Sequence, residues 1–269
     1  MEGILYLVGT PIGNLDDISI RALETLKSVD FILCEDTRHT MQLLTHFNIK
    51  KRLESFYREI EEEKSQFVIN ELQSGKNIAL VSDAGMPCIN DPGSILVQKL
   101  IENNLKYTVI PGPSAVICAI SLSGVMGPFT YLGFLPDKFS QREDLLKKHE
   151  NTGSNLVIYV APHDINKLLE DLLKILGDRK VTIIKEITKI HETIIKGNLE
   201  DIKIENPKGE FVVIIEKSKE KEEKLTETDI INLIENLVKS GVSKKEAIAI
   251  VAKENHLQKS YVYKLALDI

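Results

Sequence analysis

The sequence predicts an α/β protein with two α/β domains followed by a small helical unit. Up to about residue 125, short apolar runs alternate with segments of helical spacing, which indicates crossover connections and a largely parallel sheet. Further on, five strand candidates have only two helices among them, which favours a mixed or antiparallel sheet. We expect domains over residues 1–115 and 116–216, a charged linker over 217–224 and a helical unit over 225–269.

In the first domain, apolar runs bounded by turn residues predict strands, and apolar residues three and four positions apart predict helices. Strands are expected at 4–8, 31–34, 78–81 and 107–110, and helices at 19–28, around 43–47, and at 59–74 and 94–102. The apolar segment 116–126, after a Pro-rich bend, is expected to be a buried helix.

In the second domain, the same criteria predict strands at 129–134, 156–160, 181–184, 193–195 and 211–215, with helices at 141–150 and 164–176. The last unit has three helical patterns, and Ser243 is placed as the N-cap of the second. This is the outline of a helix-turn-helix. From Lys239 to Lys264, six lysines stand against two glutamates, so both a solvated bundle and a nucleic-acid-binding unit stay open.

The composition is that of an ordinary globular protein, with 43% hydrophobic and 28% charged residues and no apolar run long enough for a membrane span. No export signal precedes the first apolar run, so the cytoplasm is the expected compartment. Cys34, Cys88 and Cys118 fit no metal spacing and are expected to be free, packed thiols. The net charge of −6 argues against nonspecific nucleic-acid binding over the whole surface.

The loop at residues 81–93 is the strongest indication of a ligand site. It follows an apolar strand and is dense in Gly, Pro and carboxylates, and ligands of α/β proteins bind at such strand ends. It lacks the spaced glycines of a dinucleotide site and the lysine of a P-loop, so a polar or cationic ligand fits better than a pyrophosphate. The structural alternative is a turn in which Asp91 caps the next helix and Pro92 begins it.

Five segments in fixed order carry a resemblance to a known family: residues 7–19, 81–93, 110–115, 133–136 and 186–192. Together they resemble the ribosomal RNA small-subunit methyltransferase I family, part of the tetrapyrrole-methylase fold group of S-adenosylmethionine-dependent methyltransferases. Each motif alone is weak, but five in order are specific. The resemblance runs from about Ile4 to Glu216, and the helix-turn-helix tail also occurs in this subfamily.

The resemblance implies an enzyme that methylates the ribose 2′-hydroxyl of a cytidine in small-subunit (16S) ribosomal RNA. It further implies S-adenosylmethionine (SAM) in a cleft between the two α/β domains, no metal, and a homodimer. The matching cofactor-binding positions are Asp83, Ala84, Gly85, Met86, Pro87, Pro111, Gly112, Ser114, Ala115, Leu135 and Pro136. The expected substrate contacts are Thr10, Pro11, Gly13, Asn14, Arg38, Lys244 and Lys245.

Two positions depart from the family pattern. Met86 stands where the subfamily usually has threonine, which changes a contact near the cofactor. Val160 stands where the subfamily usually has glutamate, so no catalytic carboxylate is assigned there.

A neutral ribose hydroxyl is a poor nucleophile, so a positioned base or a nearby cation should activate it. We single out Lys185, Glu186 and Asp36, with Asp16, Glu35 and His191 as further candidates, and spacing does not decide among them. Structural alternatives stay open: Lys185 and Glu186 could pair with each other, His191 could be a partly buried hydrogen-bonded side chain, and Arg38 could form a surface ion pair.

Two other functions remain to be separated from RNA methylation. The first is a methyltransferase of the same fold that acts on a tetrapyrrole or on a modified protein side chain. The second is a regulator that binds nucleic acid and uses a methylase-like domain to sense a ligand. The first loop lacks the dense glycines of tetrapyrrole enzymes, and the helix-turn-helix also favours RNA. Whether the RNA partner is free or in an assembled small subunit stays open.

Overall fold

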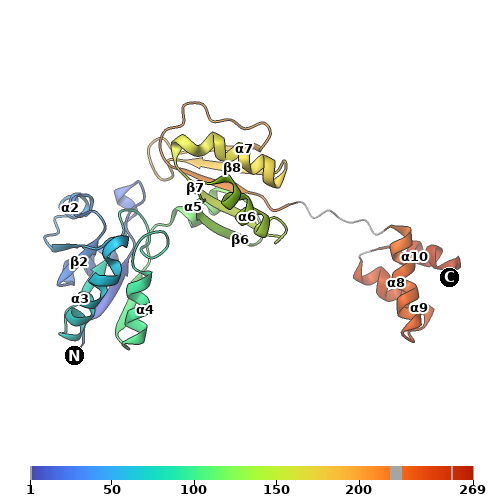
Figure 1. Ribbon diagram of the computed structural model, residues 1–269, viewed down its shortest axis with the longest axis horizontal. Helices are drawn as coiled ribbons and strands as arrows, with labels where there is room; N and C mark the ends of the chain where they lie inside the picture. The colour runs from blue at the N-terminus through green and yellow to red at the C-terminus, as the bar shows by residue number, and fades with distance from the viewer. Residues whose placement is uncertain (1, 219–225, 256, 269) are drawn as a thin grey trace. The chain divides into compact units, whose positions relative to one another are not determined.

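The computed structural model describes residues 2–218, 226–255 and 257–268. It forms two compact units, Met1–Lys217 and Ser218–Ile269 (Figure 1). Of the predicted linker, Lys217 and Ser218 are described and the rest lies outside the described residues. No helix in the described ranges is long and apolar enough to cross a bilayer.

The first unit begins with a five-stranded sheet in the order β3-β2-β4-β1-β5, in which all neighbouring strands are parallel. The predicted parallel sheet is confirmed, with one strand, β3, that the sequence did not predict. The strands are β1 (Ile4–Val8), β2 (Phe31–Cys34), β3 (Arg52–Ser55), β4 (Ile78–Leu80) and β5 (Lys106–Ile110). The helices are α1 (Ile20–Ser28), α2 (Thr37–His46), α3 (Glu61–Gln73) and α4 (Ser94–Glu102), with short 3-10 turns η1 (Leu15–Asp17) and η2 (Arg58–Ile60).

Alternate residues of these strands belong to two different hydrophobic cores. Ile32 and Cys34 of β2 pack with α1 and α2, whereas Phe31 and Leu33 pack with α3 and α4. Successive side chains of a strand point to opposite faces, so four apolar residues in a row suit a strand that is covered on both sides. The helices therefore cover the two faces of the sheet, and the loops at its strand ends are available to form a site.

The second sheet has the order β6-β7-β10-β8-β9 and is mixed, as predicted: β6 and β7 are parallel and the other neighbours antiparallel. The strands are β6 (Phe129–Phe134), β7 (Asn155–Val160), β8 (Lys180–Lys185), β9 (Thr193–Asn198) and β10 (Phe211–Ile215). The helices are α5 (Ala115–Ser123), α6 (Phe139–His149) and α7 (Ile165–Leu176), with the turn η3 (Pro162–Asp164). α6 and α7 contribute to one core of this sheet and α5 to the other.

The helix expected at 116–126 is present, but it ends earlier and is less completely buried than predicted. α5 ends at Ser123 because Gly124 adopts a left-handed conformation (φ 71°), which terminates helices. Val116 and Ala119 are buried, but Ile117 is 55% exposed and Met126, beyond the helix, is 86% exposed. The apolar composition of this segment therefore did not predict that one side of α5 is exposed in the single chain.

The start of α4 also differs from the expectation that Asp91 caps it. Gly93 is the N-cap, with φ 131°, and the capping oxygen comes from another helix. Glu61 Oε1 of α3 accepts hydrogen bonds from the backbone N–H groups of Gly93, Ile95 and Leu96, at 2.8, 2.9 and 3.3 Å. The capping oxygen is far away in sequence, so local pattern could not reveal it.

The second unit consists of α8 (Glu227–Lys239), α9 (Lys244–Glu254) and α10 (Lys259–Leu265), followed by the turn η4 (Ala266–Asp268). The three predicted helices and the Ser243 cap are confirmed, since the Ser243 side chain accepts a hydrogen bond from Glu246 N. This unit has a core of its own, which includes Ile234, Val251 and Val262.

Candidate functional site

Loops that follow β1, β2 and β4 meet at the carboxyl edge of the first sheet. Two of them are joined by a β-bridge: Thr10 N–H donates to Gly85 O at 2.9 Å, and Gly85 N–H donates to Thr10 O at 3.1 Å. Gly85 has φ +87°, a conformation that side chains with a Cβ rarely adopt. The bridge therefore holds the Asp83 loop, the strongest ligand-site candidate, in one conformation.

A pocket of about 490 Å³ opens beside this edge. From the first sheet it is lined by the ends of the β2 and β4 loops, and from the second sheet by residues around β6, β7, β8 and β10. The lining residues are Ile12, Glu35, Asp83, Ala84, Gly85, Met86, Ile89, Asn90, Asp91, Ser114, Ala115, Phe134, Tyr159, Val160, Ala161, Pro162, Ile187, Glu210, Phe211 and Val212.

Three carboxylates, Glu35, Asp83 and Asp91, make one wall of this pocket negative. Burial raises the pKa of Asp91, and the nearby charge of Asp83 raises it further. Burial also raises the pKa of Glu35, with Asp91 and Asp83 as further causes. The Asp36 backbone N–H donates to Asp83 Oδ1 at 3.2 Å, which helps to hold that carboxylate in place. Such a wall attracts a cation and repels a phosphate.

The second sheet contributes mainly aromatic and apolar residues to the pocket, together with Glu210. The Tyr159 ring meets those of Tyr131 and Phe134 edge-on, with centroids 5.1 and 5.6 Å apart. Asn90 Nδ2 donates to the Tyr131 hydroxyl, which links the Asp83 loop to the second sheet. Phe134 lines the pocket and is 63% exposed, so its ring is available to pack against a ligand.

The predicted cofactor-binding residues fall into two groups. Asp83, Ala84, Gly85, Met86, Ser114 and Ala115 line the pocket. Pro87, Pro111, Gly112, Leu135 and Pro136 are neighbours in sequence that do not line it. Gly112 has a packing role: a Cβ there would lie 2.7 Å from Gly9 Cα, so the two loops can approach only as glycines.

None of the three catalytic residues singled out from the sequence lines the pocket. Asp36 caps α2 and pairs with Arg38 at 2.7 Å, and its hydrogen bonds from Arg38 hold the pKa of its carboxyl far below the usual range. Glu186 pairs with Lys189 at 2.9 Å rather than with Lys185. Lys185 Nζ lies 5.9 Å from the ring centroid of Phe211, a lining residue.

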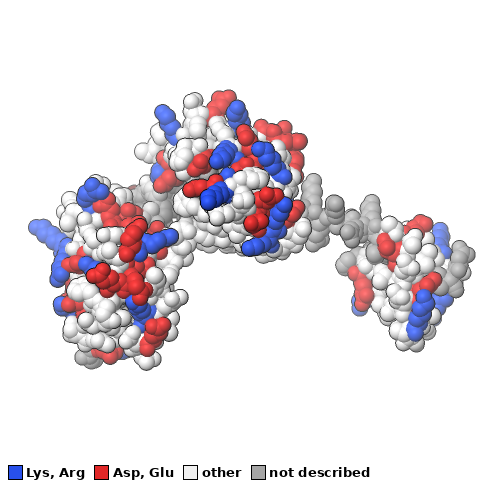
Figure 2. All heavy atoms as spheres, viewed as in Figure 1, with Lys and Arg blue, Asp and Glu red and all other residues white. Residues whose placement is uncertain are grey.

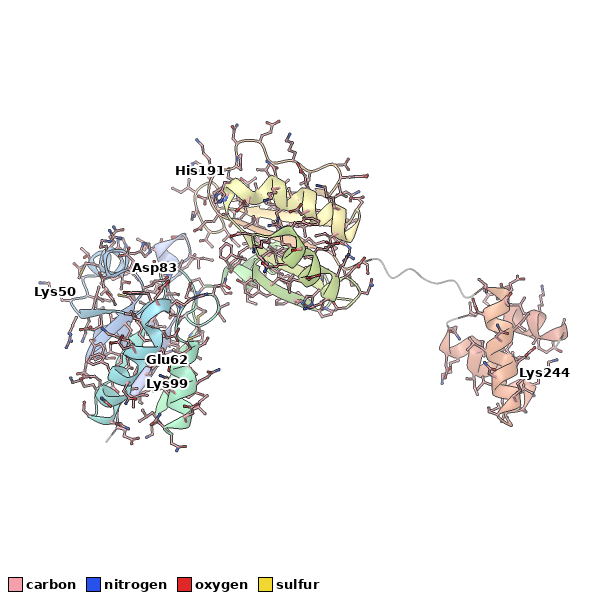
Figure 3. All side chains as sticks on the ribbon, viewed as in Figure 1. Lys50, Glu62, Asp83, Lys99, His191 and Lys244 are labelled. Carbon is pink, nitrogen blue, oxygen red and sulfur yellow. The ribbon has the colours of Figure 1, made fainter. Side chains whose placement is uncertain are left out.

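The other candidates divide in the same way. Glu35 faces the pocket, whereas Asp16 does not line it. His191 is exposed on the second half of the first unit (Figure 3), so the expectation of a partly buried side chain was wrong. Among the six candidates, Glu35 thus lines the pocket together with Asp83, while Asp36 contacts Asp83 through its backbone N–H.

The predicted substrate residues of the first loop have mainly structural contacts. Thr10 is 1% exposed, and its hydroxyl lies 3.1 Å from Ser82 O, to which it donates. Gly13 lies close to Lys189 and Thr188, the Asn14 side chain accepts from Asp16 N, and Pro11 is half-buried. Arg38 has a side chain that is 88% exposed, and it forms the anticipated surface ion pair.

Lys244 and Lys245 belong to the second unit, at the start of α9 (Figure 3). They line a groove of about 540 Å³ together with Ile248, Lys259, Tyr263, Ala266 and Leu267. Figure 2 shows acidic and basic side chains interspersed on the visible face of each unit.

Several lining residues were not anticipated as site residues. Ile89, Asn90 and Asp91 lie in the loop that indicated the site, and Asp91 had been considered as a helix cap. Phe134 lies in segment 133–136, which the resemblance placed at the cofactor, although only Leu135 and Pro136 were singled out there. Segment 210–212 begins an ordinary apolar strand and carried no signal, because strand pairing alone brings it to the pocket.

The cysteines are free, as predicted: Cys34 is buried, while Cys88 and Cys118 are half-buried. Burial raises the pKa of Cys88 to about 11, so its thiol is not a reactive group of the site.

Comparisons with known proteins agree on one family. The model of the family described as Tetrapyrrole (Corrin/Porphyrin) Methylases matches residues 4–203. A protein of Halalkalibacterium halodurans named Ribosomal RNA small subunit methyltransferase I is 40% identical over 273 residues, which cover 98% of this chain and 94% of that protein. A protein of the same name from Thermotoga maritima is 42% identical over 218 residues, or 79% of this chain and 98% of the relative. A solved diphthine synthase shares the fold, with a TM-score of 0.62 at 18% identity, over 79% of this chain and 89% of that one.

Proposed function

We propose a specific reaction on the premise that this chain is a methyltransferase: it belongs to the tetrapyrrole (corrin/porphyrin) methylase family and, within it, to the group of relatives named Ribosomal RNA small subunit methyltransferase I. In this proposal it transfers a methyl group from S-adenosylmethionine to the ribose 2′-hydroxyl of a cytidine in small-subunit (16S) ribosomal RNA.

The observation that carries the proposal is the negative wall of the pocket. Glu35, Asp83 and Asp91 converge there, and aromatic side chains of the second sheet line the same pocket. When bound, the sulfonium donor supplies an electrophilic methyl group and a positive charge. Carboxylates fit that charge, and the apolar lining residues exclude water from the reacting groups. We propose Asp83, Ala84, Gly85, Met86, Ser114 and Ala115 as the cofactor contacts, with Pro87, Pro111, Gly112, Leu135 and Pro136 supporting them.

We propose Glu35 as the base that takes the proton from the attacking hydroxyl. Its raised pKa makes it a better proton acceptor at neutral pH than Asp36, whose pKa is held low by Arg38. Asp36, Lys185 and Glu186 become positioning residues, because each contacts a group that lines the pocket. Asp36 N–H donates to Asp83, Lys185 lies over Phe211, and Glu186 Oε1 accepts from Glu210 N at 2.8 Å.

The RNA is proposed to reach the pocket along the first unit and to be held by the second. Arg38 follows Glu35 closely in sequence and is largely exposed, so its guanidinium can meet a phosphate once it leaves Asp36. The loop with Thr10, Pro11, Gly13 and Asn14 shapes that side of the site. Lys244 and Lys245 are proposed as contacts in the second unit.

A homodimer is proposed from an apolar surface of the first unit. β5 is an edge strand, and its Tyr107 and Val109 are 42% and 46% exposed. Ile101 of α4 and Ile117 of α5 are each 55% exposed. Exposed edge strands and apolar patches are typical of subunit contacts. The expected compartment is the cytoplasm, where the proposed RNA substrate lies.

The decisive experiment incubates the purified chain with methyl-labelled S-adenosylmethionine, with and without small ribosomal subunits. Label retained on a filter with the chain alone reports cofactor binding, and label in the RNA reports transfer. Mass spectrometry of digested RNA then identifies the nucleotide. Cofactor binding without any label in the RNA would contradict the proposed substrate and favour a tetrapyrrole or a protein side chain instead.

A further inference from the structure

The groove in the second unit has a composition unlike that of an ordinary helix surface. Its floor is apolar, with the buried Ile248 and Ala266, while Leu267 is apolar but 62% exposed, and three lysines also line the groove. Tyr263, from α10, completes the lining and is 57% exposed. A concave site with an apolar floor, an aromatic ring and cations at its edge suits a ligand that is flat and anionic.

The helices of this unit carry both lysines and carboxylates, but the charged residues that line the groove are lysines. In its described part, the one ion pair joins Lys239 to Glu235 and lies on α8. No Asp or Glu is among the groove's described lining residues, and Lys244, Lys245 and Lys259 are exposed. Their charges are therefore available to phosphate groups, even though the whole chain is negative.

Tyr263 distinguishes two kinds of nucleic-acid partner. A helix that reads a duplex enters the major groove with a protruding face. Here the surface between α9 and α10 is hollowed, and the exposed ring stands among its lining residues. Unpaired bases can leave the stack and lie against an aromatic side chain, while paired bases cannot.

We propose that the groove between α9 and α10 binds single-stranded RNA, with a base stacked on Tyr263 and neighbouring phosphates held by Lys244, Lys245 and Lys259. The inference rests on the proposed function, which makes RNA the partner, and it adds that this unit captures an unpaired segment rather than a duplex. The helix-turn-helix outline alone would have suggested the opposite.

The test uses the full chain and a labelled single-stranded RNA of about eight nucleotides, within the usual range of single-strand sites. Fluorescence anisotropy gives its dissociation constant at several salt concentrations, next to a hairpin of the same base composition. We expect the single strand to bind more tightly. Tyr263→Ala should raise the dissociation constant about tenfold, the cost of losing one base stack, and Tyr263→Phe should not.

Two matched controls lie on the same helices outside the groove. Tyr261 is 40% exposed on α10, and its hydroxyl donates to Glu227, so Tyr261→Ala should leave RNA affinity unchanged.

Lys245→Gln should flatten the plot of log affinity against log salt by about 0.7, the value for one lost phosphate contact on a single strand. Lys253→Gln, on α9 but away from the groove, should leave that slope unchanged.

Equal affinity for single strand and hairpin, or unchanged affinity of Tyr263→Ala, would overturn the proposal. If Tyr263→Ala disturbs the helices, as circular dichroism would show, the slope of Lys245→Gln decides instead, and an unchanged slope rejects the site. Methyl transfer to small subunits is measured separately. If Tyr263→Ala and Lys245→Gln bind single-stranded RNA like the parent while methyl transfer is intact, the inference alone is refuted. If the groove binds RNA but the chain transfers no methyl group, the proposed function alone is refuted.

Discussion

At the scale of single residues, the pocket shows how carboxyl groups at neighbouring strand ends become chemically different. Asp36 is half-buried and bound to a guanidinium, which lowers its pKa. Glu35, one residue earlier, is more exposed but lies near other carboxylates, and its pKa is raised. The sequence could place both at a strand end but could not tell which one faces the ligand. That depends on the start of α2, which turns Asp36 toward Arg38.

Asp83→Ala should weaken the binding of S-adenosylmethionine by about 2 kcal/mol, or roughly 30-fold, the usual value of a hydrogen bond or close contact to a charged group. The fold should persist, because the Thr10–Gly85 bridge holds the loop through its backbone. Isothermal calorimetry measures the affinity, with Asp144→Ala, an exposed position on α6, as control. Equal affinities of the Asp83 variant and the parent would remove Asp83 from the cofactor site.

Glu35→Gln should lower the rate of methyl transfer by about 10²–10⁴-fold, the usual contribution of a general base. Cofactor affinity should change far less. For the parent, the rate should rise with pH through the raised pKa of Glu35, because the base must be ionised to accept a proton. Single-turnover rates over a pH series check this, and a Glu35→Gln variant with an unaltered pH profile would assign the base elsewhere.

Asp91→Asn should raise the thermal stability of the ligand-free chain at neutral pH while weakening cofactor binding. The pKa of Asp91 is raised in the folded chain, so ionisation there costs stability, and the free energy of unfolding falls as pH rises through that pKa. The gain from the variant should therefore vanish below the ordinary Asp pKa of about 3.9, for example at about pH 3. Thermal unfolding of the variant and the parent at neutral and at acid pH measures the gain in stability. A gain that is larger at acid pH would contradict this account.

At the scale of elements, the sequence predicted those whose signal is local. β1, α4 and the five strands of the second sheet lie within a few residues of the expected positions. β3 was missed because Arg52-Leu-Glu-Ser55 is polar and lies at the sheet edge, where pairing with β2 rather than composition makes it a strand. The cap of α4 was missed for a similar reason, since its acceptor, Glu61, comes from α3.

Glu61→Ala should destabilise the first unit by about 2 kcal/mol, because it leaves three N–H groups of the α4 start without an acceptor. Glu62→Ala is the matched control. Glu62 is the next residue and pairs with Lys99 at 2.6 Å, but it is 72% exposed (Figure 3), so its loss should cost about 0–1 kcal/mol. Urea unfolding measures the free energy of unfolding of both variants. Equal losses would show that the Glu61 cap stabilises the fold no more than the exposed Glu62–Lys99 ion pair does.

At the scale of the whole molecule, the two units have separate cores and are proposed to have separate tasks. The Thermotoga maritima relative aligns over 218 residues, close to the length of the first unit, Met1–Lys217. A protein with that name can therefore be about fifty residues shorter than this chain, which fits a second unit that assists in capturing the substrate and does not take part in the chemistry.

Deleting residues 225–269 should leave cofactor affinity and the unfolding of the first unit unchanged. Activity at low concentrations of small subunits should fall by about tenfold, since two or more phosphate contacts are lost. The loss should shrink at saturating substrate and at higher salt. Steady-state kinetics with ribosomal subunits test this, and a truncated chain with undiminished activity would exclude the second unit from substrate capture.

The bridge between Thr10 and Gly85 has a thermodynamic consequence for the ligand. A loop whose Gly85 is already held by two backbone hydrogen bonds loses less conformational entropy when a ligand binds. Fewer contacts are then needed for a given affinity. A methionine at position 86, where the subfamily usually has threonine, can be accommodated because the backbone around it keeps the same conformation. In the proposed site, the first loop, with Thr10 buried and its hydroxyl donating to Ser82 O, would thus support cofactor binding indirectly, by holding the neighbouring loop in its binding conformation.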